Sequence, residues 1–180
     1  MVASVCVFAG SARVAPPEHE ELARALGASL GAADLTVVYG GGSRGLMGTM
    51  ADAALDAGAR VIGVVPRGLF AVEDVHPGRI EVVEVDDLLE RKRVMIELSD
   101  AFLALPGGLG TLDELVEVVT WAQLGLHAKP IVLVDADDYW DSLLEWVDGA
   151  VQRGYVTAAS RRLLQVVELA AVVGALRSDC

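Results

Sequence analysis

Short apolar runs of strand length alternate with amphipathic segments of helix length along nearly the whole chain. The runs expected to form strands are Val2–Ala9, Leu35–Tyr39, Arg60–Val65, Ile80–Val85, Ala101–Leu105 and Ile131–Val134. Strands that are almost continuously Val, Ile and Leu are buried on both faces, as in parallel sheets covered by helices. Crossovers between parallel strands are right-handed. The sequence therefore predicts an α/β fold, a Rossmann-like doubly wound parallel sheet with helices on both faces.

The segments between these runs have helical periodicity. The expected helices are Pro16–Ala32, Leu46–Asp56, Asp86–Ser99, Thr111–Leu124, Tyr139–Val151 and Ala159–Leu176, and residues 67–79 are expected to be irregular. In the first helix, leucine recurs every four residues at Leu22, Leu26 and Leu30, opposite a charged face. No linker or repeat divides the 180 residues. We therefore expect one domain over residues 1–180.

Composition excludes several classes of protein. Hydrophobic residues make up 53% of the chain, which disfavours disorder. The net charge of −12 disfavours binding to nucleic acid. No apolar run approaches the roughly 18 residues of a membrane span, so we expect no membrane partner. Cys6 and Cys180 form neither a disulfide framework nor a zinc pattern, and His19, His76 and His127 share no ligand spacing. No basic residue precedes the first apolar run, so we expect a cytoplasmic protein without a signal peptide.

Three of the expected strands end in turns that are rich in glycine, namely Gly10-Ser11, Gly40–Gly45 and Pro106–Thr111. In a doubly wound sheet, ligands bind beyond the carboxyl ends of the strands. Glycine lets backbone N–H groups approach a ligand closely, and the following helix N-terminus attracts anions. The turns predict a phosphate-binding crevice, with Ser11, Gly41 and Gly42 among its contacts. The alternative is that these glycines only make tight turns between strands and helices.

Two common nucleotide-binding motifs do not fit the chain. The first turn lacks the G-x-G-x-x-G pattern, and the second strand ends in Val38-Tyr39 without an acidic residue, which disfavours NAD. The Gly-Lys-Ser/Thr ending of a P-loop is also missing. We expect neither a metal ion nor an organic cofactor.

The segment Leu105–Glu114, LPGGLGTLDE, is the most specific feature of the sequence. One interpretation is structural, because Thr111 and Glu114 match the capping box T-x-x-E at a helix start. The three glycines and the proline that precede Thr111 are not explained by capping. A flexible turn with many N–H groups, followed by a hydroxyl, suits a phosphate. Glu114, one turn further along the helix, would then face a ribose.

The run Glu90-Arg91-Lys92-Arg93 carries the densest positive charge in this acidic chain. It is either a solvated basic face or a source of cations beside the anion-binding turn. Arg91, Lys92 and Arg93 are consecutive on a helix and cannot all face the same way. We therefore expect at least one of Arg91 and Lys92 to point toward the crevice.

Four segments together resemble the Lonely guy family, whose members are cytokinin riboside 5′-monophosphate phosphoribohydrolases and were often labelled lysine decarboxylases. They are VCVFAGSA, LTVVYGGGSRGLMG, LLERKRVM and LPGGLGTLDELVEVVTWAQLGLHAKPIVLV. The resemblance runs from about Val2 to Trp146. It implies a homodimer that hydrolyses the N-glycosidic bond of a nucleoside 5′-monophosphate, releasing the free base and ribose 5-phosphate.

The resemblance also implies roles for individual residues. The catalytic pair of the family falls on Arg91 and Glu114. The implied substrate contacts are Glu73, Lys92, Gly108, Leu109, Gly110, Thr111, Leu112, Asp113 and Thr120. Met95 is expected to form an apolar wall beside an N6 substituent of the base.

The chemistry of these side chains fits the cleavage of an N-glycoside. The transition state is oxocarbenium-like, so a carboxylate such as Glu114 beside C1′ stabilises the positive charge and orients the attacking water. Arg91 stays charged at any relevant pH and could bind the carboxylate, the sugar phosphate or the leaving base. A second hypothesis is that the chain is a noncatalytic module that binds or carries a nucleotide. The presence of both Arg91 and Glu114 favours the enzyme.

Overall fold

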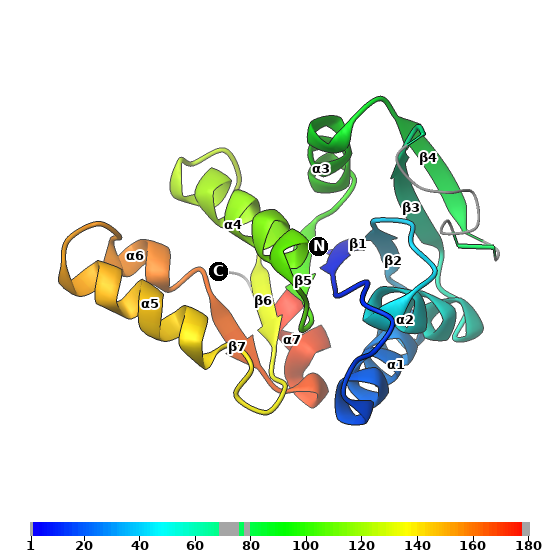
Figure 1. Cartoon of the computed structure of the whole chain (residues 1–180), viewed down its shortest axis with the longest axis horizontal. Helices are drawn as coiled ribbons and strands as arrows, with labels where there is room; N and C mark the ends of the chain where they lie inside the picture. The colour runs from blue at the N-terminus through cyan, green and yellow to red at the C-terminus, as the bar shows by residue number, and fades with distance from the viewer. Residues whose placement is uncertain (1, 69–75, 78–79, 178–180) are drawn as a thin grey trace.

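The computed structural model describes residues 2–68, 76–77 and 80–177 (Figure 1). The strands are Ser4–Phe8 (β1), Thr36–Tyr39 (β2), Val61–Pro66 (β3), Glu81–Val85 (β4), Ala101–Ala104 (β5), Ile131–Val134 (β6) and Gln165–Val167 (β7). The α-helices are Pro17–Ala32 (α1), Gly45–Asp56 (α2), Leu88–Glu97 (α3), Leu109–Gln123 (α4), Asp141–Gln152 (α5), Ala158–Arg161 (α6) and Val172–Arg177 (α7), and a 3₁₀ helix (η2) spans Leu169–Ala171. None of the helices in these ranges is long and apolar enough to cross a membrane.

The strands form one parallel sheet in the order β4-β3-β2-β1-β5-β6-β7. β1 pairs with β2 on one side, where Val5 lies opposite Val37, and with β5 on the other, where Val5 lies opposite Ala101. The chain thus builds outward from β1 in one direction and then returns to build outward in the other. The carboxyl ends of β1 and β5 are the switch point at which doubly wound sheets bind ligands.

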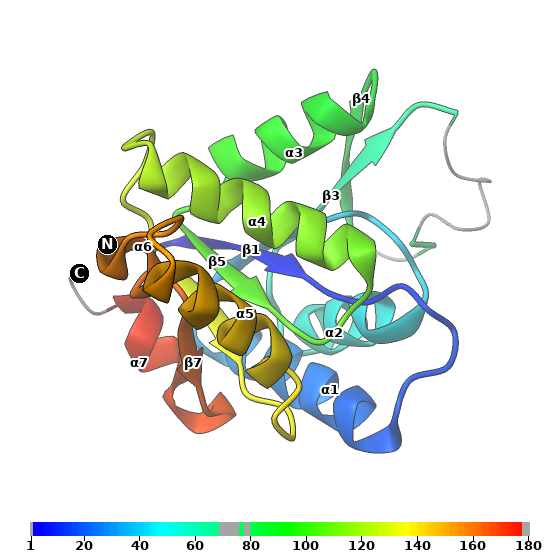
Figure 2. The same cartoon turned by 60° about the vertical axis from the view of Figure 1, so that its left-hand side comes forward.

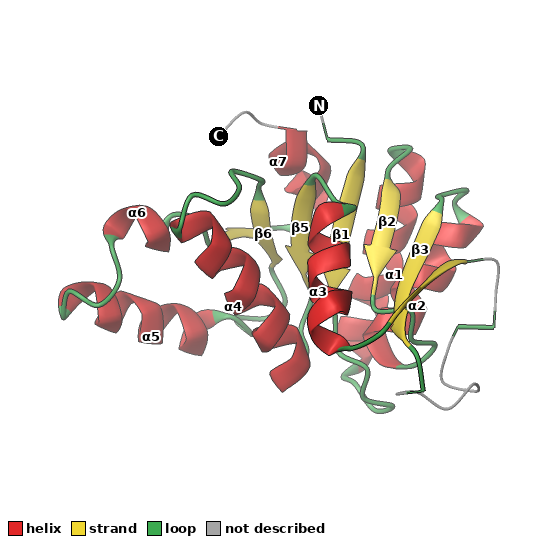
Figure 3. Cartoon of the chain, turned by 90° about the horizontal axis from the view of Figure 1, so that it is seen from above, coloured by secondary structure: helices red, strands yellow, loops and turns green. Residues whose placement is uncertain are grey.

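Helices cover both faces of the sheet (Figures 2 and 3). α1, α2 and α7 lie on one face, and α3 to α6 lie on the other. The alternation of side chains along β1 supplies both layers of the core, since Val5 and Val7 pack with the first group of helices and Cys6 and Phe8 with the second. The predicted Rossmann-like doubly wound fold is confirmed.

The expectation for the C-terminal part was wrong in one respect. Instead of one helix over Ala159–Leu176, the chain forms α6, the strand β7, η2 and α7, so β6 is not the last strand. Thr157 caps α6 by accepting a hydrogen bond from the Ser160 N–H, and the helix ends after four residues. β7 then pairs with β6, Val132 lying opposite Gln165. β7 has only three residues, and the apolar residues around it are spaced as in a helix, so the sequence pattern predicted a helix there.

α1 and α2 pack so closely that only glycine fits between them. A Cβ added at Gly27 of α1 would lie 2.2 Å from the carbonyl oxygen of Met50 in α2. Gly27→Ala should therefore lower the free energy of unfolding by about 1–3 kcal/mol, measured by urea denaturation. Gly174→Ala is the matched control, because a Cβ there meets no atom of the described residues within 4 Å and the change should stabilise α7 by about 0.5–1 kcal/mol. Equal effects of the two changes would contradict this explanation.

Candidate active site

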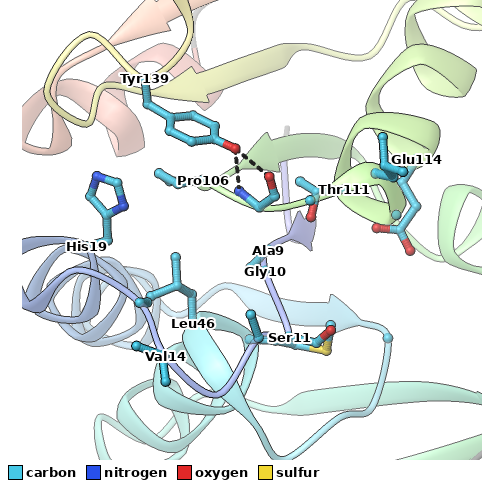
Figure 4. A pocket seen from close by; sticks show the side chains of 18 of the residues that line it. Ala9, Gly10, Ser11, Val14, His19, Leu46, Pro106, Thr111, Glu114 and Tyr139 are labelled. Carbon is cyan, nitrogen blue, oxygen red and sulfur yellow. Dashed lines mark hydrogen bonds between the residues drawn. The ribbon is translucent and has the colours of Figure 1, made fainter.

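A cavity of about 530 Å³ lies at the switch point of the sheet. It is lined by the loops that follow β1, β2, β5 and β6 and by side chains of α1 to α4: Ala9, Gly10, Ser11, Ala12, Val14, Ala15, Pro16, His19, Gly40, Leu46, Met47, Arg91, Pro106, Gly107, Gly108, Leu109, Gly110, Thr111, Glu114 and Tyr139. In Figure 4, Thr111 and Glu114 lie toward one end of the cavity, and His19, Val14 and Tyr139 lie toward the other. The charged pair of the lining, Arg91 and Glu114, comes from α3 and α4.

The N-terminus of α4 faces this cavity. The helix begins at Leu109 with Gly108 as its N-cap, two residues earlier than the sequence suggested, and no side chain caps it. The capping-box interpretation is therefore wrong, because Thr111 already lies inside the first turn and the carboxylate of Glu114 is bound elsewhere. The first N–H groups of a helix lack intrahelical acceptors, so this turn presents donors and a positive dipole end to the cavity.

The loops after β1 and β5 touch each other in front of this helix. The Gly10 N–H donates to the Pro106 carbonyl at 3.0 Å. A Cβ at Gly107 would lie 2.1 Å from the Thr111 hydroxyl oxygen and 2.8 Å from the Gly10 nitrogen. Because residue 107 is glycine, the backbone at Gly10 and the hydroxyl of Thr111 can both pack against the loop after β5.

Arg91 of α3 and Glu114 of α4 form an ion pair at the edge of the cavity. The Arg91 Nη2 donates to the Glu114 Oε1 at 2.6 Å, and the two side chains are only 13% and 9% exposed. Within the described ranges, the buried Arg91 Nε has no hydrogen-bond partner. The pair therefore has a remaining donor, and both of its residues line the cavity.

Burial raises the pKa of Glu114 to about 6, against the opposing positive charge of Arg91. The charge of Asp113 contributes to the rise, and Lys92 opposes it. The folded protein therefore binds this proton more tightly than the unfolded chain, whose glutamate has a pKa of 4.5. The resulting stabilisation is complete below pH 4.5 and is lost as the pH rises through about 6. At neutral pH, Glu114 is ionised beside Arg91.

The other two basic residues of α3 have different partners. Lys92 binds the carboxylates of Asp113 and Glu117 at 3.0 and 2.6 Å, and its side chain is largely buried between α3 and α4. Arg93 lies on the solvent side and pairs with Glu97. The solvated-face interpretation thus holds for Arg93 alone, and Arg91 is the one that points to the cavity.

Known proteins are similar to this chain in sequence, and solved structures are similar to it in fold. A sequence profile described as "possible lysine decarboxylase" matches residues 47–175. The cytokinin riboside 5′-monophosphate phosphoribohydrolase of Rhodococcoides fascians is 42% identical over 177 residues, covering 97% of this chain and 89% of that protein. This chain belongs to the Lonely guy family. A probable cytokinin riboside 5′-monophosphate phosphoribohydrolase of Oryza sativa subsp. japonica is 46% identical over 88% of this chain and 75% of its own length.

Solved structures similar to this Lonely guy protein show the fold alone. The molybdenum cofactor binding protein of Rippkaea orientalis superposes with a TM-score of 0.71 at 21% identity, covering 95% of this chain and 93% of that one. The molybdenum cofactor carrier protein of Chlamydomonas reinhardtii gives a TM-score of 0.69 at 21% identity, over 97% and 95% of the two chains.

The structure brings most of the predicted site residues of this Lonely guy protein to the cavity. Those that line it are Ser11, Arg91, Gly108, Leu109, Gly110, Thr111 and Glu114. Asp113 is exposed and binds Lys92, and neither they nor Leu112 are among the lining residues. Gly41 and Gly42 are not among the lining residues, whereas Gly40 of the same loop is.

Two other expected contacts lie away from the cavity, and one is not described. Met95 is 1% exposed and belongs to the core under α3, so within this chain it does not form the expected wall. Thr120 lies on the exposed side of α4, and its hydroxyl donates to the Val116 carbonyl at 2.7 Å. Glu73 lies outside the described residues. No group of three or more His, Cys, Asp or Glu side chains in the described ranges could hold a metal ion.

Some residues that line the cavity had no place in the sequence-based prediction. His19 and Tyr139 border the end away from Glu114 (Figure 4). Tyr139 follows the carboxyl end of β6, the strand beside β5. Its place at the cavity could be predicted only from the strand order, which the sequence does not give.

The charges around Glu114 predict how its titration responds to substitution. Asp113→Asn removes a negative charge near Glu114 and one of the two carboxylates that bind Lys92, so the pKa of Glu114 should fall below its value of about 6. The side-chain carboxyl ¹³C shift of Glu114, followed by NMR against pH, measures this directly. Glu145→Gln on α5 removes the same charge at a distance and should leave the titration unchanged. A pKa that stays constant or rises in Asp113→Asn contradicts the assignment.

Proposed function

We propose that this protein hydrolyses the N-glycosidic bond of N6-substituted adenosine 5′-monophosphates, releasing a free cytokinin base and ribose 5-phosphate. The observation that carries the proposal is the ion pair of Arg91 on α3 and Glu114 on α4, which borders the same cavity as the N-terminus of α4. An anion-binding turn and a carboxylate that stabilises a cation are the two groups this reaction needs. The names of the relatives agree with this activity.

The 5′-phosphate is proposed to bind at the N-terminus of α4. Gly108, Gly110 and the buried Thr111 lie there, and Ser11 of the loop after β1 also lines the cavity. Backbone N–H groups and a hydroxyl donate to the anion, and the helix dipole favours its charge. Lys92 and Arg93 are already bound by carboxylates, so most of the attraction comes from the backbone.

With the phosphate in this position, C1′ of the ribose faces Glu114. As the C1′–N9 bond breaks, its electron pair leaves with the base and positive charge develops on the ribose ring, where the ionised carboxylate stabilises it. Glu114 also orients a water molecule, whose oxygen bonds to C1′ and whose proton is released. The base takes up a proton from solvent. Arg91 holds Glu114 in its ionised form, and its buried Nε is a further donor for substrate.

The protein is further proposed to act as a homodimer whose interface includes α3 and α4. Large apolar side chains are exposed on and after these helices, among them Leu89 at 72%, Leu109 at 85% and Leu124 at 67%. Exposed apolar patches of this kind are typical of subunit interfaces. We retain the cytoplasmic location expected from the sequence, where Cys6 stays a buried free thiol.

Substrates should be distinguished by their phosphate. Adenosine 5′-monophosphate or its N6-isoprenoid form should release base, measured by chromatography, whereas the matching nucleoside should be nearly inert. Charged hydrogen bonds contribute roughly 1.5–3 kcal/mol each, and part of that energy orients C1′, so loss of the phosphate lowers kcat as well as raising KM. Equal rates on nucleoside and monophosphate would exclude the phosphate position proposed here. Tight binding of the monophosphate without released base would favour a nucleotide carrier.

Glu114→Gln should abolish most turnover while leaving the fold intact. The substitution keeps the shape of the side chain and removes only the charge that stabilises the cationic transition state. Turnover of the monophosphate and circular dichroism measure the two effects separately. Glu145→Gln serves as the control for removing one carboxylate from an exposed helix position. A variant that hydrolyses the substrate at close to the wild-type rate would remove Glu114 from the mechanism.

The proposed interface predicts the mass in solution. Light scattering at micromolar concentration should give the mass of a dimer, and Leu89→Asp should shift it toward the monomer because a charge enters an apolar contact. Val166→Asp, on the edge strand β7, is the control and should keep the dimer mass. A monomer mass for the wild-type protein would refute the dimer.

A further inference from the structure

Tyr139 borders the cavity at the end away from Glu114 and has no part in the mechanism above. Its hydroxyl donates a hydrogen bond to the carbonyl oxygen of Gly107, and the Gly107 N–H donates back to the same hydroxyl at 3.4 Å (Figure 4). A side chain from the loop after β6 thus binds the backbone at the centre of the loop after β5. These two loops belong to neighbouring strands of the sheet.

The ring of Tyr139 is held in place by its surroundings. Asp137 and Asp138, just before it, have positive φ angles of 46° and 61°, which make a tight left-handed turn after β6. The ring packs edge-on against Trp140, which is buried, with centroids 5.1 Å apart. It also meets the ring of His19 edge-on at 5.9 Å. The hydroxyl is therefore a fixed donor on a rigid support.

The bond from Tyr139 sets the orientation of the peptide between Gly107 and Gly108. A trans peptide is planar, and its C=O and N–H point in opposite directions. When Tyr139 holds the carbonyl of Gly107, the N–H of Gly108 must point away from Tyr139. Gly108 is the N-cap of α4 and lines the cavity. Because glycine stands on both sides of this peptide, its plane rotates at little steric cost unless something holds it.

We propose that Tyr139 is a positioning residue for the substrate phosphate. Its hydroxyl keeps the Gly107–Gly108 peptide in the orientation that presents an N–H to the anion, and prevents a rotation that would place the carbonyl oxygen there instead. This assignment rests on the proposed function, in which the phosphate binds at the N-terminus of α4. Tyr139 acts through the backbone of Gly107 and is not assigned to the chemical step.

Tyr139→Phe tests the assignment, because it removes the hydroxyl and keeps the ring contacts with His19 and Trp140. KM for adenosine 5′-monophosphate should rise about tenfold, the effect of one lost hydrogen bond, and kcat should fall by a smaller factor because the phosphate also orients C1′. The Kd of inorganic phosphate, measured by calorimetry, should rise by a similar factor. The slow hydrolysis of adenosine and the unfolding temperature should stay close to those of the wild type. Tyr155→Phe, which removes the hydroxyl of a tyrosine that is 82% exposed, should change none of these values.

The outcomes separate this assignment from the proposed function. If wild-type protein releases base and Tyr139→Phe has unchanged KM and phosphate affinity, the positioning role is overturned and the function stands. A variant that loses activity on adenosine and on its monophosphate to the same extent also overturns it, because the effect is then not specific to phosphate. If the variant binds phosphate more weakly but even the wild type releases no base, the positioning role is supported and the hydrolase function fails.

Discussion

The ion pair of Arg91 and Glu114 is the interaction around which this protein is organised. The two side chains come from helices on either side of β5 in the sequence, α3 before the strand and α4 after it, and both helices cover the same face of the sheet (Figure 3). A pair that is about nine-tenths buried costs desolvation energy, and such pairs are often no better for stability than apolar residues. Burial raises the pKa of Glu114 and leaves one donor of Arg91 without a partner in the described ranges. Those are properties of a site that acts on a ligand rather than of a site that only holds helices together.

The charge distribution explains how an acidic protein can receive an anionic substrate. The chain has a net charge of −12, and the three basic residues of α3 are each paired with a carboxylate. The basic side chains of α3 therefore contribute little free positive charge at the cavity. The N-terminus of α4 and the glycine backbone around it supply oriented dipoles, which act at short range and fit one phosphate group. This arrangement favours a compact monophosphate over a polyanion.

The fold and much of the site could be predicted from the sequence, because the signals were local. Alternating buried strands and amphipathic helices determine the doubly wound class, and the glycine turns mark the ends of β1, β2 and β5. β7 was missed because it has only three residues, within a segment whose apolar residues are spaced as in a helix. The role of Glu114 in capping was wrong because the start of α4 depends on the backbone of Gly108, which has no side-chain signal. Tyr139 and the burial of Met95 depend on which strands are neighbours, and this is a property of the folded sheet.

The central claim is that one nucleotide occupies both the N-terminus of α4 and the carboxylate one turn further along. A crystal structure of the Glu114→Gln variant with adenosine 5′-monophosphate tests this most directly. The account predicts the phosphate against the N–H groups of residues 108–111, with C1′ in contact with the side chain at position 114. A phosphate bound by Arg91 and Lys92, with C1′ directed toward His19 and Tyr139, would contradict it.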